Sequence, residues 1–451
     1  MNKKILFTVL LLSFGTYAQN TFVPDDIFEQ ALIDMGYDNP PLDNYVPTAN
    51  IENITVLTLS SLGIFDLTGI EDFSALEILY ATNNNLTSID ISQNLNLERI
   101  VVSNNFLSSL DVSQNSMLEI LNCSYNSFST LNLSQNSQLK ELYCDNNNLS
   151  QLDLSNNPLI EILHCQSNSL SSLNTTANPN IISLSCQGNN MNNLNITGCT
   201  ELEILYCHAN NLTALDVTQN INLRLLFAGI NNIASIDLSN NVNLTYFWFS
   251  ENLITSLDLS HNLGLQNLVV SSNNLTELDV SLNTELIEVG VNNNQITSLD
   301  LSNGNQLIWL HCEMNQLESL NVKNGNNINV TGFFAYDNPN LSCIEVDDPI
   351  YSDANWPDVD PQIVFSEDCN PLGIIDNEND NLSIYPNPVN DKIFIESSEN
   401  IKVIQVYDLL GKLELETTQK ILELNHIVQG VYILKVIHKN GAVQNFKVIK
   451  N

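Results

Sequence analysis

The sequence has little positive charge. Its 451 residues include 14 lysines and arginines against 51 aspartates and glutamates, a formal net charge of −37. A surface of this sign repels phosphate backbones and anionic lipids, so we expect neither nucleic-acid binding nor docking to membranes through basic clusters. Between residues 19 and 380 the basic residues are Arg99, Lys140, Arg224 and Lys323, whereas eight lysines accompany seven acids from Asn381 onward. This shift in composition marks a domain boundary, with residues 370–380 as the linker.

Known catalytic motifs are missing as well. The sequence contains no glycine-rich phosphate loop, no H-E-x-x-H, no G-x-S-x-G and no paired C-x-x-C. We therefore predict that the protein is not an enzyme and has no cofactor and no metal ligands. Apolar residues still make up 43% of the chain, which is enough for a large core.

Long apolar segments are scarce too. Lys3 and Lys4 precede a short apolar run over residues 5–14, and Tyr17-Ala18 precedes a plausible cleavage point before Gln19. This order is typical of a secretory signal peptide. The run is too short to span a bilayer comfortably. We interpret residues 1–18 as a cleaved signal rather than an anchor, and we expect no transmembrane segment.

A repeat fills the middle of the chain. A Leu-Asp-Leu pattern begins at Ile89 and recurs every 21 residues, twelve times in all, to Leu320. A second apolar pattern lies between the copies, as in Leu118, Leu121 and Cys123. Each half of the unit has only 10 or 11 residues, which leaves room for one short strand and a tight turn. The period of two within each half predicts strands with one buried face.

These units resemble leucine-rich repeats of the short kind that is common in exported proteins of Bacteroidota. The resemblance covers about residues 50–345. It implies a mainly β fold, a solenoid over residues 51–342 with short parallel strands on two faces, whose stacked coils share one core. We expect a helical cap over residues 19–50, with its helix at 22–37, and a C-terminal cap over residues 343–369.

Asparagine recurs in two columns at the turns. An amide group both donates and accepts, so a buried Asn can satisfy backbone groups of the neighbouring coil, and we interpret both columns as structural. The first column comprises Asn105, Asn126, Asn147, Asn168, Asn189, Asn210, Asn231, Asn252, Asn273, Asn294 and Asn315, and the second comprises Asn94, Asn115, Asn136, Asn157, Asn178, Asn220, Asn241, Asn262 and Asn283.

Cysteine also forms a column. We interpret its members as small buried hydrophobes rather than a thiolate metal site, because side chains stacked in a line do not surround a tetrahedral ion and lie too far apart for relaxed disulfides. Cys343 and Cys369 lie outside the column, and we expect a disulfide between them that stabilises the cap by ~3 kcal/mol. The column comprises Cys123, Cys144, Cys165, Cys186, Cys207 and Cys312.

Three histidines, His164, His208 and His311, each adjoin a cysteine of this column. Neighbours on a strand point to opposite faces, so the thiol and the imidazole cannot form a nucleophile pair.

The Leu-Asp-Leu strand of each unit displays a run of aspartates, Asp216 to Asp300 at 21-residue steps. These carboxylates either splay into solvent, keep their protons or bind cations between coils. We expect weak, diffuse cation association without a built site.

Large aromatic side chains point outward from the first strand of the unit, where neighbouring coils place them ~5 Å apart. A contiguous exposed surface of this kind marks an interaction site, and the alternative is a surface covered by a partner subunit or a flanking loop. The candidate ligand-binding residues are Tyr143, His164, Tyr206, His208, Phe227, Tyr246, Trp248, Trp309 and His311.

Residues 381–451 have a different character. Short strand-like runs over 382–385, 392–396, 403–407, 431–437 and 446–449 predict a small β-sandwich. The runs S-I-Y-P-N-P from Ser383, V-Y-D-L-L-G-K from Val406 and G-V-Y-I-L-K-V from Gly430 precede a lysine-rich end. In this order they resemble the type A C-terminal sorting domain of the type IX secretion system. The resemblance implies export by that machinery across the outer membrane of a Gram-negative Bacteroidota cell, removal of the domain, and release or attachment to surface lipopolysaccharide.

These observations predict a secreted or cell-surface binding protein that presents its aromatic strands to an extracellular protein or glycan in adhesion or recognition. The alternative is a structural matrix or spacer protein whose regular faces self-associate.

Overall fold

The computed structural model describes residues 19–369, 382–397, 400–408, 411–439 and 443–451. The predicted signal peptide and linker lie outside the described residues. The chain divides into two compact units, Met1–Glu367 and Asp368–Asn451.

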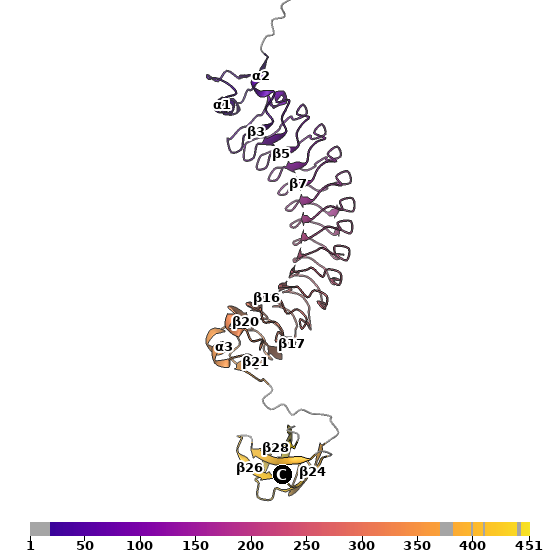
Figure 1. Ribbon diagram of the computed structural model, residues 1–451, viewed down its shortest axis with the longest axis vertical. Coiled ribbons are helices and arrows are strands. Elements are labelled where there is room, and N and C mark those ends of the chain that lie inside the picture. The colour runs from indigo at the N-terminus through magenta and orange to yellow at the C-terminus, as the bar shows by residue number, and fades with distance from the viewer. Residues whose placement is uncertain (1–18, 370–381, 398–399, 409–410, 440–442) are drawn as a thin grey trace, which may run out of the picture. The chain divides into compact units, whose positions relative to one another are not determined.

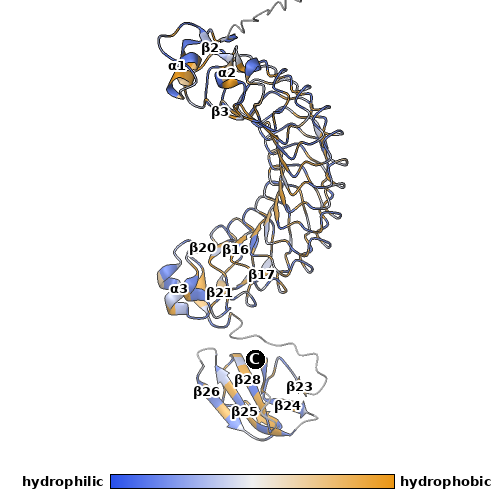
Figure 2. Cartoon of the chain, turned by 45° about the horizontal axis from the view of Figure 1, so that its top comes forward, coloured by the Kyte–Doolittle hydropathy of each residue, from blue (hydrophilic) through white to orange (hydrophobic). Residues whose placement is uncertain are grey.

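The first unit is a curved solenoid built on one long parallel sheet. Figures 1 and 2 show its strands along the inner, concave edge of the curve. In most of these three-residue strands the middle side chain is buried and its two neighbours are partly exposed. In sheet order the strands are β3 (Val56–Thr58), β4 (Ile78–Tyr80), β5 (Arg99–Val101), β6 (Ile120–Asn122), β7 (Glu141–Tyr143), β8 (Ile162–His164), β10 (Ser183–Ser185), β12 (Ile204–Tyr206), β13 (Leu225–Phe227), β14 (Tyr246–Trp248), β15 (Asn267–Val269), β16 (Glu288–Gly290), β18 (Trp309–His311) and β20 (Gly332–Phe334).

The predicted 21-residue register holds along this sheet. Tyr206 pairs with Phe227, for example, and Phe227 pairs with Trp248. The first and last steps are longer, because Val56 pairs with Ile78 and Trp309 pairs with Gly332. The extra residues of the last step accompany the short helix η2 (Asn327–Asn329). A fixed register places the same position of every unit on the same face.

The opposite side of the solenoid has strands in only some coils. β9 (Ser172–Asn174) pairs with β11 (Asn193–Asn195), and β17 (Ser298–Asp300), β19 (Ser319–Asn321), β21 (Cys343–Glu345) and β22 (Val364–Ser366) form a second small sheet. The sequence predicted strands throughout this face. The solenoid curves toward its long sheet, so coils are spaced more widely on the outer side and inter-coil backbone bonds form there in fewer places.

The first asparagine column joins each coil to its neighbour as predicted. The Nδ2 of Asn147 donates to the carbonyl oxygens of Cys123 and Cys144 at 3.1 Å each, and its Oδ1 accepts from the backbone nitrogen of Phe128 at 2.9 Å. Asn84 and Asn338 make the same kinds of bond at the two ends of the column. The prediction missed Asn338 because it follows Asn315 by more than 21 residues.

The second column behaves differently from the prediction. The Nδ2 of Asn136 donates to the carbonyl oxygens of Val112 and Asn115 at 3.0 and 2.8 Å. Its Oδ1 is buried and has no hydrogen-bond partner among the described residues. The amides of this column therefore link coils as donors only.

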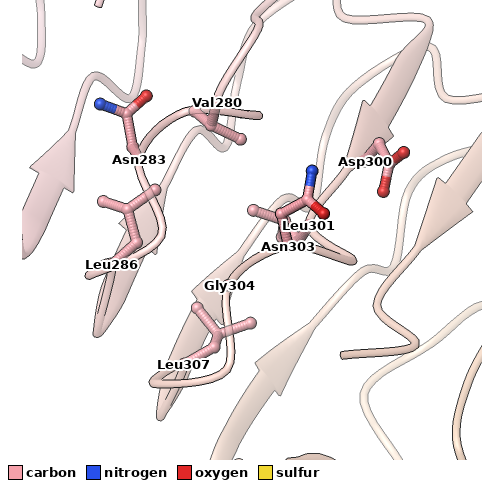
Figure 3. Close-up of a pocket in the computed structure, with 8 residues that line it drawn as sticks. All are labelled: Val280, Asn283, Leu286, Asp300, Leu301, Asn303, Gly304 and Leu307. Atoms are coloured by element: carbon pink, nitrogen blue, oxygen red, sulfur yellow. The ribbon is translucent and has the colours of Figure 1, made fainter. Parts of the chain in front are cut away.

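Gly304 stands where the second column would have its next asparagine (Figure 3). A cavity of about 10 Å³ lies there, lined by Val280, Asn283 and Leu307 among others. The nearest atom to a Cβ added at Gly304 is the carbonyl oxygen of Leu301 at 3.7 Å, so a side chain has room to begin. The gap is thus the space left by one missing amide.

The two ends of the solenoid are capped. The cap helix α1 (Asp26–Asp34) is shorter than predicted, because Asp25 starts it by accepting from the backbone nitrogens of Ile27 and Phe28 at 2.9 and 3.0 Å. Its other oxygen accepts from the nitrogen of Phe65 at 2.8 Å and so ties the helix to the first coil. The cap also contains β1 (Asn20–Phe22), β2 (Tyr45–Pro47), α2 (Thr48–Ile51) and, in the first coil, η1 (Ile70–Asp72).

At the other end, α3 (Pro349–Asn355) precedes Trp356, which is 2% exposed. The indole stacks on Phe333 with ring centres 4.1 Å apart and planes within 6°. Cys343 and Cys369 are disulfide-bonded, and the other seven cysteines are free and buried.

The second unit consists of two antiparallel sheets around one core that includes Ile393, Ile404 and Leu434. This is the predicted small β-sandwich, although the sequence analysis did not predict the strands over residues 413–417 and 421–423. One sheet contains β23 (Leu382–Tyr385), β24 (Lys392–Ser397) and β27 (Ile421–Glu423), and the other contains β26 (Leu413–Thr417), β25 (Ile401–Asp408), β28 (Gly430–His438) and β29 (Val443–Lys450).

The cavity at Gly304 yields a stability prediction. Gly304→Asn should raise the free energy of unfolding by about 1 kcal/mol, because the new amide donates to the carbonyl oxygens of Val280 and Asn283 and glycine's extra freedom in the unfolded chain is lost. Denaturant unfolding followed by circular dichroism measures the change. The reverse substitution, Asn241→Gly, is the control and should destabilise the protein. A lower unfolding midpoint for Gly304→Asn would show that the coil cannot hold the amide.

Candidate functional site

The nine candidate ligand-binding residues all lie along the long sheet, and the structure gathers them into three groups. The first group is Tyr143 and His164 on neighbouring strands. Their ring centres are 5.0 Å apart and their planes are nearly perpendicular, at 86°. Both side chains are half-buried.

The central group contains five rings in contact. Phe227 stacks on Tyr206 and on Tyr246, with centres 4.7 Å apart in both pairs. Trp248 lies edge-on to Phe227 at 5.9 Å and to His208 at 5.1 Å. The cluster is continuous over β12, β13 and β14, because paired strands hold these positions side by side.

The third group lies at the C-terminal end of the sheet. Trp309 is 45% exposed and lies parallel to His311, within 4° and 6.4 Å between centres. The sequence analysis missed Phe334, which stacks on His311 at 4.5 Å and 12°. Phe334 escaped notice because the longer last coil moves it out of the 21-residue step. The first asparagine column has the same longer step, from Asn315 to Asn338, and this step could have revealed the position of Phe334.

Small residues separate the three groups. Ser185 lies between the first and central groups, and Val269 and Gly290 lie between the central and third groups. The face therefore offers three separate aromatic patches, whereas the sequence suggested one contiguous surface.

The rings of the first two patches are themselves uncharged at neutral pH. Burial lowers the pKa of His164 and of His208, so both imidazoles are neutral at neutral pH. The hydroxyl of Tyr143 donates to Glu141 at 3.0 Å, and burial together with this bond raises the pKa of Tyr143 to about 12. The rings thus present apolar faces with few polar groups.

The cysteine column lies beneath these rings. All six thiols are buried. Burial raises the pKa of Cys123, Cys165 and Cys207 to about 12. The thiols therefore keep their protons at neutral pH and are poor nucleophiles and metal ligands. The neighbouring histidines point away from the core on the concave face, as strand alternation predicts.

The carboxylates of the aspartate run on the opposite side accept hydrogen bonds from their own coils. The Oδ1 of Asp237 and of Asp258 each accepts from the backbone nitrogen two residues on, at 2.9 Å. Hydrogen bonds from Ser239 and Ser260 lower the pKa of these two carboxyls, so they are ionised at neutral pH. Two hollows of about 580 and 340 Å³ lie along the run. In the described part of the chain, no three His, Cys, Asp or Glu side chains are placed to hold one metal ion.

Comparison with known proteins identifies the C-terminal unit. Residues 383–451 match the family model of the secretion system C-terminal sorting domain. A comparison with curated proteins gives no match.

Solved structures resemble much of the chain. The functional domain of InlJ from Listeria monocytogenes, which includes a cysteine ladder, is 25% identical, with a TM-score of 0.68 over 96% of this chain and 99% of that chain. The internalin InlF from Listeria monocytogenes is 21% identical, with a TM-score of 0.56 over 78% of this chain and 93% of that chain. A leucine-rich-repeat protein from Leptospira interrogans is 22% identical, with a TM-score of 0.54 over 70% of this chain and 77% of that chain.

The fold and the family match define the class of protein. The chain is a leucine-rich-repeat solenoid followed by a type IX secretion sorting domain. It is therefore exported by the type IX system of Bacteroidota to the cell surface or the extracellular space. In the parts of the chain that the structure describes, no helix is both long and apolar enough to cross a membrane.

The sorting domain yields an export prediction. A chain truncated before Asn381, expressed in a Bacteroidota host, should accumulate as a folded solenoid in the periplasm, because it lacks the signal for the last export step. Immunoblots of periplasmic, surface and medium fractions measure this, with the full-length chain as the control. Normal amounts of truncated chain outside the cell would refute the role of this domain.

Proposed function

We propose that the protein binds an extracellular protein or glycan through the concave sheet, in adhesion or recognition, and that it acts by binding rather than by catalysis. The central group of Tyr206, His208, Phe227, Tyr246 and Trp248 carries this proposal. Its five aromatic rings are joined by a chain of ring contacts and lie on the concave face, outside the buried core. Their partial exposure leaves apolar area that a ligand would cover.

The geometry suits recognition. The rings stand on hydrogen-bonded strands, so they lose little conformational entropy when a partner binds. Aromatic side chains that are fixed in this way supply most of the binding energy in many protein interfaces, and their flat faces also stack on sugar rings. Both partner classes therefore fit the central group.

A second candidate function, a self-associating structural protein, is favoured by one feature of the opposite side. Ile221, Val242 and Leu263 occupy the same position in three consecutive coils and are each 54–55% exposed. A row of apolar side chains on a regular outer surface is suited to contact between copies of the chain.

The two candidates predict different outcomes for paired variants. The double substitution Phe227→Ser and Trp248→Ser should leave the thermal unfolding midpoint within a few degrees of the parent and abolish binding in glycan-array and pull-down assays, because both rings point outward. The matched control, Val242→Ser with Leu263→Ser, should keep binding.

Two results would contradict the binding proposal. Unfolding of the Phe227/Trp248 variant would show that these rings belong to the core. Loss of concentration-dependent assembly in the Val242/Leu263 variant, with no saturable ligand for the parent protein, would favour the structural candidate. Sedimentation velocity of all three proteins measures the assembly.

A further inference from the structure

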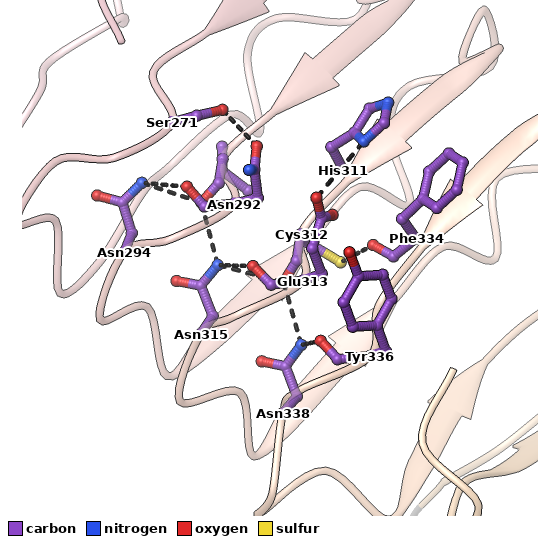
Figure 4. Close-up of polar contacts among 11 residues, drawn as sticks. Ser271, Asn292, Asn294, His311, Cys312, Glu313, Asn315, Phe334, Tyr336 and Asn338 are labelled. Carbon is purple, nitrogen blue, oxygen red and sulfur yellow. Dashed lines mark hydrogen bonds and ion pairs between the residues drawn. The ribbon is translucent and has the colours of Figure 1, made fainter. Parts of the chain in front are cut away.

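Glu313 lies two residues beyond β18, beside the third aromatic group, and is only 7% exposed (Figure 4). Its Oε1 lies 3.6 Å from the Nδ1 of His311. Its Oε2 is buried and has no hydrogen-bond partner among the described residues. A buried carboxylate oxygen without a partner costs free energy, so packing alone does not account for an acid at this position.

Other coils show how this position is otherwise filled. Asp145 occupies it in the coil of β7 and is 7% exposed, but both of its oxygens are bonded, to the hydroxyl of Ser124 and the amide of Asn146. Ser250 and Asn292 occupy it nearer to Glu313 and carry no charge. Glu313 differs from these because one oxygen of this buried acid has no hydrogen-bond partner among the described residues.

No lysine or arginine within residues 19–369 is paired with this carboxylate. Among residues 19–369, Lys140 pairs with Glu119 at 2.8 Å and Arg224 pairs with Glu203 at 3.4 Å. Lys323 donates to the backbone oxygen of Glu367 at 2.9 Å. The fourth basic residue, Arg99, is on β5, ten strands away from β18 in the sheet.

The rings beside Glu313 form a flat wall. The planes of Trp309 and His311 lie within 4° of each other, and the planes of His311 and Phe334 lie within 12°. A methyl group added to Gly332 would collide with the indole of Trp309, so the indole lies directly over this glycine. The exposed indole of Trp309 and a nearby carboxylate oxygen that lacks a hydrogen-bond partner together form an environment that a planar guanidinium group prefers, through cation–π contact and a charge-assisted hydrogen bond.

We propose that Trp309, His311, Phe334 and the carboxylate of Glu313 form a subsite of the concave face that takes a cationic side chain of a protein partner, an arginine guanidinium in particular. The inference rests on the proposed function of this face and narrows its partner to a protein with a basic segment. The formal net charge of −37 supports it, because a strongly acidic protein attracts such a segment over a distance.

The test uses the full chain and two acetylated, amidated pentapeptides, Gly-Gly-Arg-Gly-Gly and the same peptide with citrulline, which has nearly the same shape without the charge. Calorimetric titration at physiological ionic strength should show the citrulline peptide binding at least about tenfold more weakly. Glu313→Gln should weaken arginine-peptide binding by about the same factor, and Trp309→Ser should weaken it as well.

Glu318→Gln is the matched control, since it removes the same charge from an exposed position in the same coil. It should change binding by less than about twofold. Equal weakening by Glu313→Gln and Glu318→Gln would show that diffuse charge alone attracts the peptide. Equal binding of both peptides, or tighter binding of glucosamine than of the arginine peptide, would also overturn the subsite.

A structural role for Glu313 is tested separately. Glu313→Gln should leave the thermal midpoint unchanged or raise it, because the Oε2 that the substitution replaces has no hydrogen-bond partner among the described residues. A large decrease would mean that the carboxylate stabilises the fold, against the proposal. Full arginine-peptide binding by Glu313→Gln, together with loss of array or pull-down binding in the Phe227/Trp248 variant, would refute the subsite and leave the proposed function intact.

Discussion

The turns of this solenoid and the spacing between its coils depend on the hydrogen bonds of the buried asparagines. At every turn the chain reverses in the interior, where backbone carbonyl and amide groups have no strand partner and no water. In the first column, each amide group bonds both to its own coil and to the coil before it, as Asn147 does with Cys144, Cys123 and Phe128. One side chain therefore satisfies the turn and fixes the spacing between coils. The coil that has Gly304 in place of a second-column asparagine has a cavity there instead.

The candidate binding surface follows from this spacing. Because coils cannot slip, outward positions form straight columns, and large rings on neighbouring coils come into contact at 4.5 to 4.7 Å. The inward positions along the same sheet carry apolar groups, which range in size from the protonated thiols of the cysteine column to Phe247 and Phe333. An apolar interior thus supports an exterior whose chemistry changes along the sheet. It changes from neutral rings at Phe227 to rings beside a buried carboxylate at Glu313.

The sequence predicted those features that depend on the repeat period. The period showed which side chains point outward, the direction of each cysteine and histidine, and the role of the first asparagine column. The motifs of residues 381–451 predicted the sorting domain in the same way. Features that depend on local departures were missed. Phe334 was missed because the last coil is longer than 21 residues. The convex side has strands in fewer coils than predicted because the solenoid is curved. The free oxygens of Asn136 and Glu313 depend on which atoms meet in space, which no spacing along the chain reveals.

The central claim is that partners bind the concave aromatic sheet. Hydroxyl-radical footprinting of the full chain, alone and with the partner retained in array or pull-down assays, measures the solvent access of each side chain directly. The account predicts that Tyr206, Phe227 and Trp248 become protected while Val242 and Leu263 on the outer side stay as reactive as before. Protection of Val242 and Leu263 with no change at Phe227 and Trp248 would contradict it.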